Sequence, residues 1–209
     1  MSHELSSTFE EKWSQPLKMT ESFMDSRAAN LLFRLMAPVM ESRLRYRFSD
    51  PVTILEGAGI RPGQELLEIG CGTGFFTVSA AEMVGDGGRV YAMDPHPLAL
   101  EHVTRKMQDS GRTNVRLIKA DATEAGLVSG CVDLALLFGV IPSPIIPLDR
   151  LLPEIHRLLR SKGALAVWTA FPWWSPASLT RSGLFVWTGK EKGVHRFRKA
   201  ASGCTCRSC

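Results

Sequence analysis

The chain has 209 residues, of which 44% are hydrophobic, a formal net charge of +4 and five cysteines. This is enough apolar sequence for one well-buried core, and no run of about 18 apolar residues predicts a membrane span. The first 15 residues lack the basic-then-apolar pattern of a secretion signal, so we expect a cytoplasmic protein. The odd cysteine count argues against the paired disulfide framework of a small secreted domain.

The positive charge is concentrated near the C-terminal end. From Lys190 onward there are six Lys or Arg residues and one acid, whereas the rest of the chain has 19 basic and 20 acidic residues. A basic segment can bind RNA or another polyanion, but a solvated terminal strand is the commoner explanation. We therefore expect a small-molecule substrate rather than a nucleic acid.

Apolar residues recur at helical spacing over residues 27–48, which predicts an N-terminal helical segment. Pro38 is expected to divide this segment into two helices, because proline lacks the N–H that an interior helical residue donates. Asp50 and Pro51 predict a further short helix, with Asp50 as the N-cap and Pro51 as the first helical residue. We expect that helix to end within residues 57–59.

Short β-like runs alternate with helical patterns in the rest of the chain. Strands are predicted at 65–69, 89–94, 114–120, 131–140 and 163–171, and helices at 75–84, 97–110 and 148–160. Such alternation predicts a doubly wound α/β fold, in which helices cover both faces of a mostly parallel sheet. Residues 183–199 differ, because two strand patterns flank a turn and predict an antiparallel hairpin at the end of the sheet.

Three segments are expected along the chain: a helical cap over 1–50, an α/β domain over 51–200 and a cysteine-rich tail over 201–209. The tail thiols, Cys204, Cys206 and Cys209, could bind zinc or arsenite with the help of His195. A metal site needs a rigid frame, however, and these cysteines are the last ones in the sequence. We therefore expect a disordered tail and no metal site.

The stretch ELLEIGCGTGFFT, residues 65–77, places Gly70, Gly72 and Gly74 between a strand and a helix. A loop of this kind exposes backbone N–H groups at the carboxyl end of a sheet and lets a ligand approach closely. In a dinucleotide fingerprint the third glycine follows the second by three residues. Phe75 occupies that position here, which favours a nucleotide-like ligand without a pyrophosphate.

Two acidic residues follow the next two strands. Asp94 can accept hydrogen bonds from both hydroxyls of a ribose, although it could equally be the N-cap of the helix that starts near Pro97. Asp121 can accept from an exocyclic amine such as that of adenine, with the N–H of Ala122 donating to the ring; alone, it would be a turn residue. The glycines and acids, in order after three strands, predict a nucleoside site.

These motifs resemble those of the class I S-adenosylmethionine-dependent methyltransferases. The match rests on E-I-G-C-G-T-G, V-Y-A-M-D and A-D-A-T at the ends of the first three strands, and it covers about residues 50–171. One departure is Ser161-Lys162-Gly163, where the family usually has Pro-Gly-Gly. The resemblance implies a Rossmann-like sheet of seven strands with the last strand antiparallel, and it identifies residues 51–200 as the S-adenosylmethionine-binding domain.

The resemblance also implies roles for individual residues. Residues 70–74, which include Cys71, would surround the methionine part of S-adenosylmethionine, and Glu68 would hold its amino group directly or through water. Asp94, followed by Pro95, would bind the ribose.

Three further residues complete the implied cofactor site. Asp121 and Ala122 would bind the adenine, and Phe138 would lie near the sulfonium. Because the cofactor supplies most of the driving force for methyl transfer, an enzyme of this kind can lack an obvious catalytic acid or base, and the catalytic residues stay unassigned.

The loop after the fourth predicted strand, residues 138–147, contains three prolines and no Asp, Glu, His or Lys. This composition excludes the Asn/Asp-Pro-Pro-aromatic signature of amino-group DNA methylation and the carboxylates of a metal-assisted catechol site. An apolar acceptor is one hypothesis, and a rigid wall that touches only the cofactor is the other. Trp173 and Trp174 could line the acceptor site or pack against the N-terminal helices, whereas His96 is expected at the surface and His156 in a structural or solvated position.

The favoured function is therefore the transfer of a methyl group from S-adenosylmethionine to a small or medium-sized acceptor. One alternative is an RNA or protein methyltransferase that uses the basic C-terminal segment as an anchor. The other is a NAD-dependent oxidoreductase, against which Phe75 and the lack of a Tyr-x-x-x-Lys pair both argue. The sequence indicates neither the acceptor nor the oligomeric state.

Overall fold

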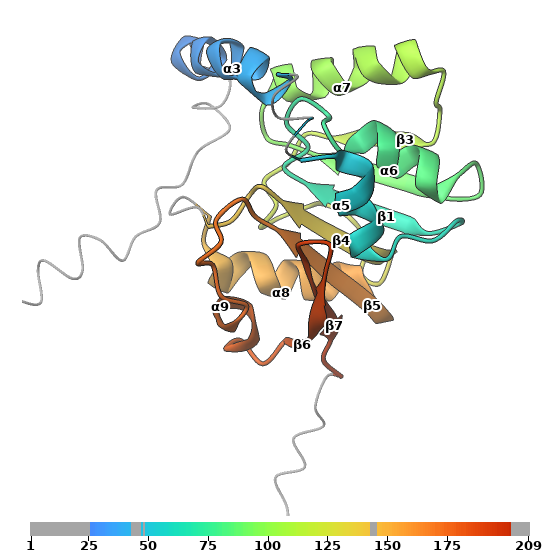
Figure 1. The fold of residues 1–209 in the computed structure, drawn as a ribbon, viewed down its shortest axis with the longest axis vertical. Coiled ribbons are helices and arrows are strands. Elements are labelled where there is room, and N and C mark those ends of the chain that lie inside the picture. The colour runs from blue at the N-terminus through green and yellow to red at the C-terminus, as the bar shows by residue number, and fades with distance from the viewer. Residues whose placement is uncertain (1–25, 43–46, 48, 143–145, 202–209) are drawn as a thin grey trace, which may run out of the picture.

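Figure 1 shows the computed structural model of the chain, which describes residues 26–42, 47, 49–142 and 146–201. The predicted tail with Cys204, Cys206 and Cys209 lies outside the described residues, as does most of the predicted cap segment. Within the described part of the chain, no helix is both long enough and apolar enough to cross a membrane.

The centre of the fold is a seven-stranded sheet with the strand order β3-β2-β1-β4-β5-β7-β6. Strands β1 to β5 are parallel to one another, and β7 is antiparallel to both β5 and β6. The mostly parallel sheet and its antiparallel hairpin are thus confirmed. The strand bounds are β1 Glu65–Ile69, β2 Arg89–Met93, β3 Val115–Ile118, β4 Val132–Phe138, β5 Leu159–Trp168, β6 Phe185–Glu191 and β7 Val194–Lys199.

Helices pack on both faces of this sheet. One face is covered by α5 (Pro51–Ala58), α6 (Thr77–Val84) and α7 (Pro97–Ser110), and the other by α8 (Leu148–Leu158) and the short α9 (Ala177–Thr180). The remaining helix, α3 (Arg27–Met40), lies beside α7 at the margin of the molecule (Figure 1).

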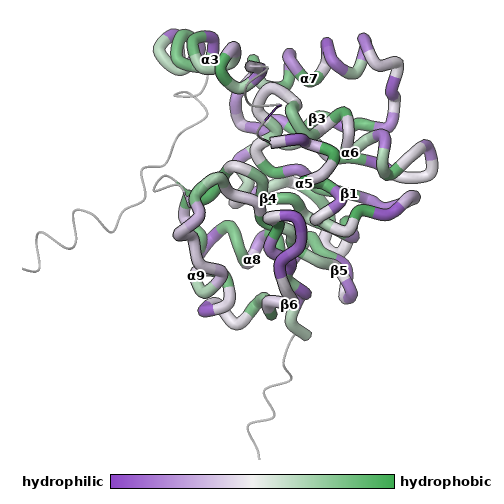
Figure 2. Tube along the Cα trace, in the orientation of Figure 1, coloured by the Kyte–Doolittle hydropathy of each residue, from purple (hydrophilic) through white to green (hydrophobic). Residues whose placement is uncertain are grey.

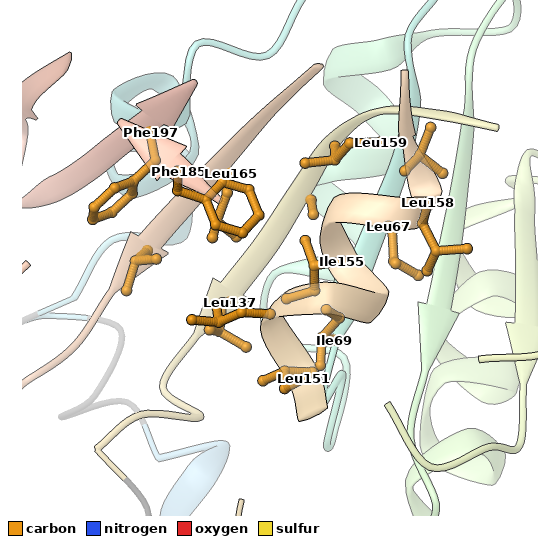
Figure 3. Close-up of a cluster of buried hydrophobic side chains, with 14 of the residues drawn as sticks. Leu67, Ile69, Leu137, Leu151, Ile155, Leu158, Leu159, Leu165, Phe185 and Phe197 are labelled. Atoms are coloured by element: carbon orange, nitrogen blue, oxygen red, sulfur yellow. The ribbon is translucent and has the colours of Figure 1, made fainter. Parts of the chain in front are cut away.

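The larger core lies between α8 and the sheet. Figure 3 shows Leu151, Ile155 and Leu158 of α8 against strand residues, with Phe185 and Phe197 bringing the C-terminal hairpin into the same cluster. Both phenylalanines are almost completely buried. The hairpin is therefore part of the main core and not an appendage.

Local signals explain most of the helix ends. The Asp50 carboxylate accepts a hydrogen bond from the Thr53 N–H at 2.9 Å, and Gly59 ends α5 with a φ of 77°, so the predicted cap and stop are both confirmed. The predicted break at Pro38 is wrong, because α3 continues to Met40. Pro38 removes the one hydrogen bond that an N–H at this position would donate to the Arg34 carbonyl, and the helix ends two residues later, at Met40.

The start of β5 also differs from the prediction. The helix was expected to reach residue 160 and the strand to begin at 163, but α8 ends at Leu158 and β5 begins at Leu159. Leu159 pairs with Val132 of β4, and a register shift follows before Leu134. Pairing with a neighbouring strand therefore overrides the turn that Ser161-Lys162-Gly163 favours locally.

The buried hairpin leads to a prediction about stability. Phe197→Ala should lower the free energy of unfolding by about 3–5 kcal/mol, because it leaves a cavity between the hairpin and α8. Val186→Ala, on the exposed side of the same hairpin, should change it by less than about 1 kcal/mol. Urea unfolding of both variants checks this, and equal effects would show that the hairpin does not share the main core.

Candidate active site

The glycine loop joins β1 to α6 at the carboxyl edge of the sheet. The N–H groups of Gly70 and Cys71 both donate to the Met93 carbonyl, at 2.8 and 3.0 Å, which ties the loop to the end of β2. Gly70, Gly72 and Gly74 have φ values of 72°, 52° and 78°. Side chains rarely tolerate this left-handed region, so the backbone shape itself requires the three glycines.

Two side chains closely approach this loop. A Cβ atom on Gly70 would lie 2.8 Å from Val140 Cγ2, and one on Gly72 would lie 2.9 Å from Met40 Cε. The loop is thus bordered by the segment after β4 and by the end of α3. Sequence reasoning did not identify Val140 or Met40, because nothing local in either segment indicates the contact.

Glu68, near the end of β1, is buried, with 2% of its surface exposed. Its carboxylate accepts a hydrogen bond of 2.6 Å from the Thr77 hydroxyl at the start of α6. Burial raises the pKa of Glu68 to about 7, and the nearby Asp94 charge adds to this, while the Thr77 bond and the Lys106 charge act in the opposite direction.

Asp94 follows β2 and is also buried. Its Oδ2 accepts from the Gly72 N–H at 3.0 Å, and its Oδ1 accepts from the His96 N–H at 2.9 Å. Burial raises the pKa of Asp94, and these two hydrogen bonds partly offset the effect. Each carboxylate oxygen keeps a further acceptor position for a ligand hydroxyl.

His96 corrects two expectations. It is buried, with 6% exposed, instead of lying at the surface, and it is the N-cap of α7 through a bond of 3.2 Å from the Leu98 N–H to its Nδ1. Asp94 is therefore not that cap. The Phe33 ring of α3 stacks on His96 with 4.6 Å between ring centroids, which covers a residue that its local sequence places in a loop.

An ion pair also holds α3 in place. Lys106 Nζ of α7 lies 2.7 Å from Glu41 Oε2, directly after α3. Both side chains are partly buried, and screening by water keeps such a pair modest in strength. Together with the Phe33–His96 stack, it fixes the end of α3 beside the glycine loop.

The arrangement fits a nucleoside ligand that carries positive charge. Glu68 and Asp94 are two buried carboxylates that raise each other's cost of ionisation, and neither forms an ion pair within the described part of the chain. A cationic ligand would stabilise both in the charged form. Thr73 Oγ1 and His96 Nε2 are also buried beside the loop without a hydrogen-bond partner among the described residues.

Asp121 and Ala122 lie after β3 at the same edge of the sheet. The Asp121 Oδ1 accepts from both the N–H and the hydroxyl of Thr123, at 2.8 Å each, so one carboxylate oxygen is used in a local turn. Asp121 is exposed, whereas Ala122 packs partly against the main core. Their contact with an adenine stays a prediction, as does the role of the half-buried Pro95.

Phe138 lies at the end of β4 with its ring buried against Phe76, at 5.1 Å between centroids and in an edge-to-face arrangement. That contact gives it a packing role, and its proximity to a sulfonium stays a prediction. Cys71 is buried in the loop, and burial raises the pKa of its thiol far above the usual value, which makes it a poor nucleophile.

The remaining candidates lie apart from the loop. Trp174 packs against the main core and contacts the ring of His195 edge-to-face at 5.1 Å, whereas Trp173 is largely exposed. His156 lies within 3.1 Å of the Ala200 carbonyl, in the structural position expected for it.

Comparison with known families agrees with this geometry. Residues 66–163 match the family model described as a methyltransferase domain, which spans the glycine loop and Asp94. The matched part of the chain, 98 of its 209 residues, is therefore similar to a methyltransferase domain.

Two curated relatives show how far the sequence similarity extends. A probable cobalt-precorrin-6B C(15)-methyltransferase (decarboxylating) from Saccharolobus solfataricus is 42% identical over 64 residues, which are 30% of this chain and 32% of that protein. The ubiquinone/menaquinone biosynthesis C-methyltransferase UbiE from Vibrio parahaemolyticus is 30% identical over 114 residues, 54% of this chain and 44% of that protein. The chain thus matches less than half the length of either relative.

Solved structures share the fold. A methyltransferase from Aquifex aeolicus superposes with a TM-score of 0.66 at 20% identity, over 77% of this chain and 94% of its own. TrmN from Thermus thermophilus superposes with a TM-score of 0.59 at 24% identity, over 72% and 48% of the two chains.

The buried carboxyl of Glu68 predicts a pH-dependent stability. Its pKa is raised when folded, so the folded state holds a proton that the unfolded state releases, and this stabilisation is lost as pH rises from about 4.5 to about 7. Glu68→Gln keeps an acceptor for Thr77 but removes the titration. Without cofactor, the free energy of unfolding of the variant should rise by roughly 2 kcal/mol relative to that of the wild type as the pH increases across that window.

Urea unfolding at several pH values tests this expectation. Because Asp94 is present in both proteins, the difference between them reports the titration of Glu68 together with its coupling to Asp94. A difference that stays constant between pH 4.5 and 7 would show that Glu68 is ionised without cost in the folded protein.

Proposed function

We propose that this protein transfers the methyl group of S-adenosylmethionine to a small or medium-sized acceptor with an apolar part. The observation that carries the proposal is the joint burial of Glu68, the glycine loop and Asp94 at the carboxyl edge of the sheet. When bound, S-adenosylmethionine supplies an electrophilic methyl group on a positively charged sulfur.

Each part of the site then has a distinct task. Asp94 accepts hydrogen bonds from the ribose hydroxyls, and the positive-φ glycines allow the methionine part of the cofactor to lie against the backbone. Glu68, ionised more readily once a cationic group is near, holds the amino group. Asp121 and Ala122 bind the adenine, and Phe138 supports the wall near the sulfur. The reaction itself needs alignment and exclusion of water.

A cavity of about 330 Å³ supports a small acceptor. It lies between the segments after β4 and β5, at the same edge of the sheet as the glycine loop, and its lining includes Pro142, Trp173, Trp174 and Arg181. Aromatic and proline side chains suit an apolar acceptor, and Arg181 suits an anionic group on it. Both curated relatives are named as C-methyltransferases, so carbon is the acceptor atom to test first.

The basic hairpin gives less support to an RNA acceptor. Lys192 pairs with Glu56, and Arg196 pairs with Glu191 while also donating to the Gly57 carbonyl at 2.6 Å. Two of the five basic residues described in this segment are therefore neutralised within the fold. The NAD-dependent alternative is set aside, because the glycine spacing and the family both indicate S-adenosylmethionine.

Replacing Asp94 tests the cofactor site. Asp94→Ala should weaken binding of S-adenosylhomocysteine by about 1–3 kcal/mol, because charge-assisted hydrogen bonds to the ribose are lost. Isothermal titration calorimetry measures this, with Asp109→Ala on the exposed end of α7 as the matched control. Unchanged affinity, or tight binding of NADH without a response to S-adenosylhomocysteine, would contradict the proposal.

Replacing Trp173 tests the acceptor cavity. Trp173→Ala should raise the KM for a productive acceptor about three- to tenfold while leaving S-adenosylhomocysteine affinity unchanged, because the ring lines the cavity and contacts Phe171, apart from the glycine loop. The acceptors to screen are phenols, quinols and tetrapyrroles, with S-adenosylhomocysteine release as the readout. Trp187→Ala on the hairpin is the control.

The RNA alternative has its own test. Lys190 and Arg198 are both exposed. The double variant Lys190→Gln with Arg198→Gln therefore lowers the charge of the hairpin without disturbing its core, whereas a truncation would remove that core. Salt-sensitive RNA binding that this double variant abolishes would favour an RNA acceptor over a small molecule.

A further inference from the structure

Helix α3 presents an apolar face to solvent. Its large hydrophobic side chains are exposed by between 47% at Met36 and 65% at Leu35. The members of this outer face are Leu31, Leu32, Leu35, Met36 and Val39. Their spacing places them on one side of the helix. Figure 2 shows α3 as a largely hydrophobic segment at the outer margin of the molecule.

The opposite side of α3 is already committed to the fold. Ala29 and Ala37 are buried, Phe33 stacks on His96, and Met40 reaches Gly72. The inner contact thus uses two alanines, Phe33 and Met40, while five further apolar residues face outward. Burial among the residues that the structure describes does not explain that distribution, and a contiguous exposed apolar patch indicates a partner.

Charge on the helix indicates the chemistry of that partner. Arg27 and Arg34 are exposed and lie seven residues apart, so both stand along the same border of the outer face. The helix sequence RAANLLFRLMAPVM contains no acidic residue. A second copy of this face would bring no anions to these arginines, whereas lipid phosphates would provide them.

We propose that α3 docks the protein on an anionic bilayer surface, with its outer face among the acyl chains and its arginines on the phosphates. The helix has 14 residues, a length of about 21 Å, which is shorter than the roughly 30 Å of a hydrocarbon core, so it lies in the plane of the interface. Basic amphipathic helices bind membranes in this way.

A second feature at the same edge of the sheet is compatible with an interface. Phe171 and Trp173, after β5, are exposed by 45% and 76% and contact each other edge-to-face at 5.4 Å. Exposed aromatic residues are favoured at the boundary between acyl chains and water. Because α3 also reaches the glycine loop through Met40, docking would place the carboxyl edge of the sheet near the lipid.

Vesicle flotation of the full chain tests the proposal without any methyl transfer. The protein should float with vesicles that contain about one-third phosphatidylglycerol and much less with pure phosphatidylcholine, and salt should weaken the binding. The triple variant Leu31→Gln, Leu35→Gln and Val39→Gln should bind roughly tenfold or more weakly. Arg27→Gln with Arg34→Gln should remove the preference for the anionic lipid.

Matched controls separate docking from general hydrophobicity. Val128→Gln and Val186→Gln remove exposed apolar residues elsewhere and should leave flotation unchanged. Circular dichroism, thermal unfolding and S-adenosylhomocysteine binding confirm that each variant remains folded.

Three results would overturn the proposal. The first is flotation that the triple variant does not reduce. The second is a concentration-dependent dimer that the triple variant dissociates, with no vesicle binding, which would assign the face to a second copy. The third is flotation only after removal of residues 1–25, which would assign the face to the segment that precedes α3.

Discussion

The hydrogen bond from the Gly72 N–H to the Asp94 carboxylate joins the loop after β1 to the end of β2. Together with the hydrogen bonds from Gly70 and Cys71 to the Met93 carbonyl, it holds this glycine loop against the edge of the sheet. It also buries a carboxylate beside Glu68, so negative charge is concentrated where the backbone is most accessible. A cationic ligand would relieve that cost, so the contact that shapes the loop also leaves a place suited to positive charge.

Helix α7 packs against the glycine loop. Val103 and Met107 pack against Cys71 and Ala92, and a Cβ on Gly74 would lie 3.1 Å from Val103 Cγ2. The loop therefore has little room to move toward the helix. The side of the loop that faces away from α7 lies at the carboxyl edge of the sheet. There it is contacted by Met40 of α3 and by Val140 after β4. Of these two neighbours, Met40 has the more flexible side chain and can move to admit a ligand.

Much of the fold follows from local patterns. Apolar runs of strand length alternate with helical spacing, and glycine, proline and aspartate mark the turns, as at Asp50 and Gly59. These signals indicate the parallel strands, the covering helices and the C-terminal hairpin. They fail where pairing or position outweighs local preference. Leu159 joins β5 because Val132 lies opposite, and α3 extends two residues past Pro38 before it ends.

The sequence by itself determined the α/β fold and the position of the glycine loop, because strand ends, glycines and Asp94 follow one another at short range. Only the tertiary structure decided what surrounds that loop. His96 is buried because Phe33, far away in the sequence, stacks on it, and Met40 and Val140 meet the glycines from two other segments. The sequence also did not show that the apolar face of α3 points outward. A helical period shows that a helix has an apolar face, but not whether the fold covers that face.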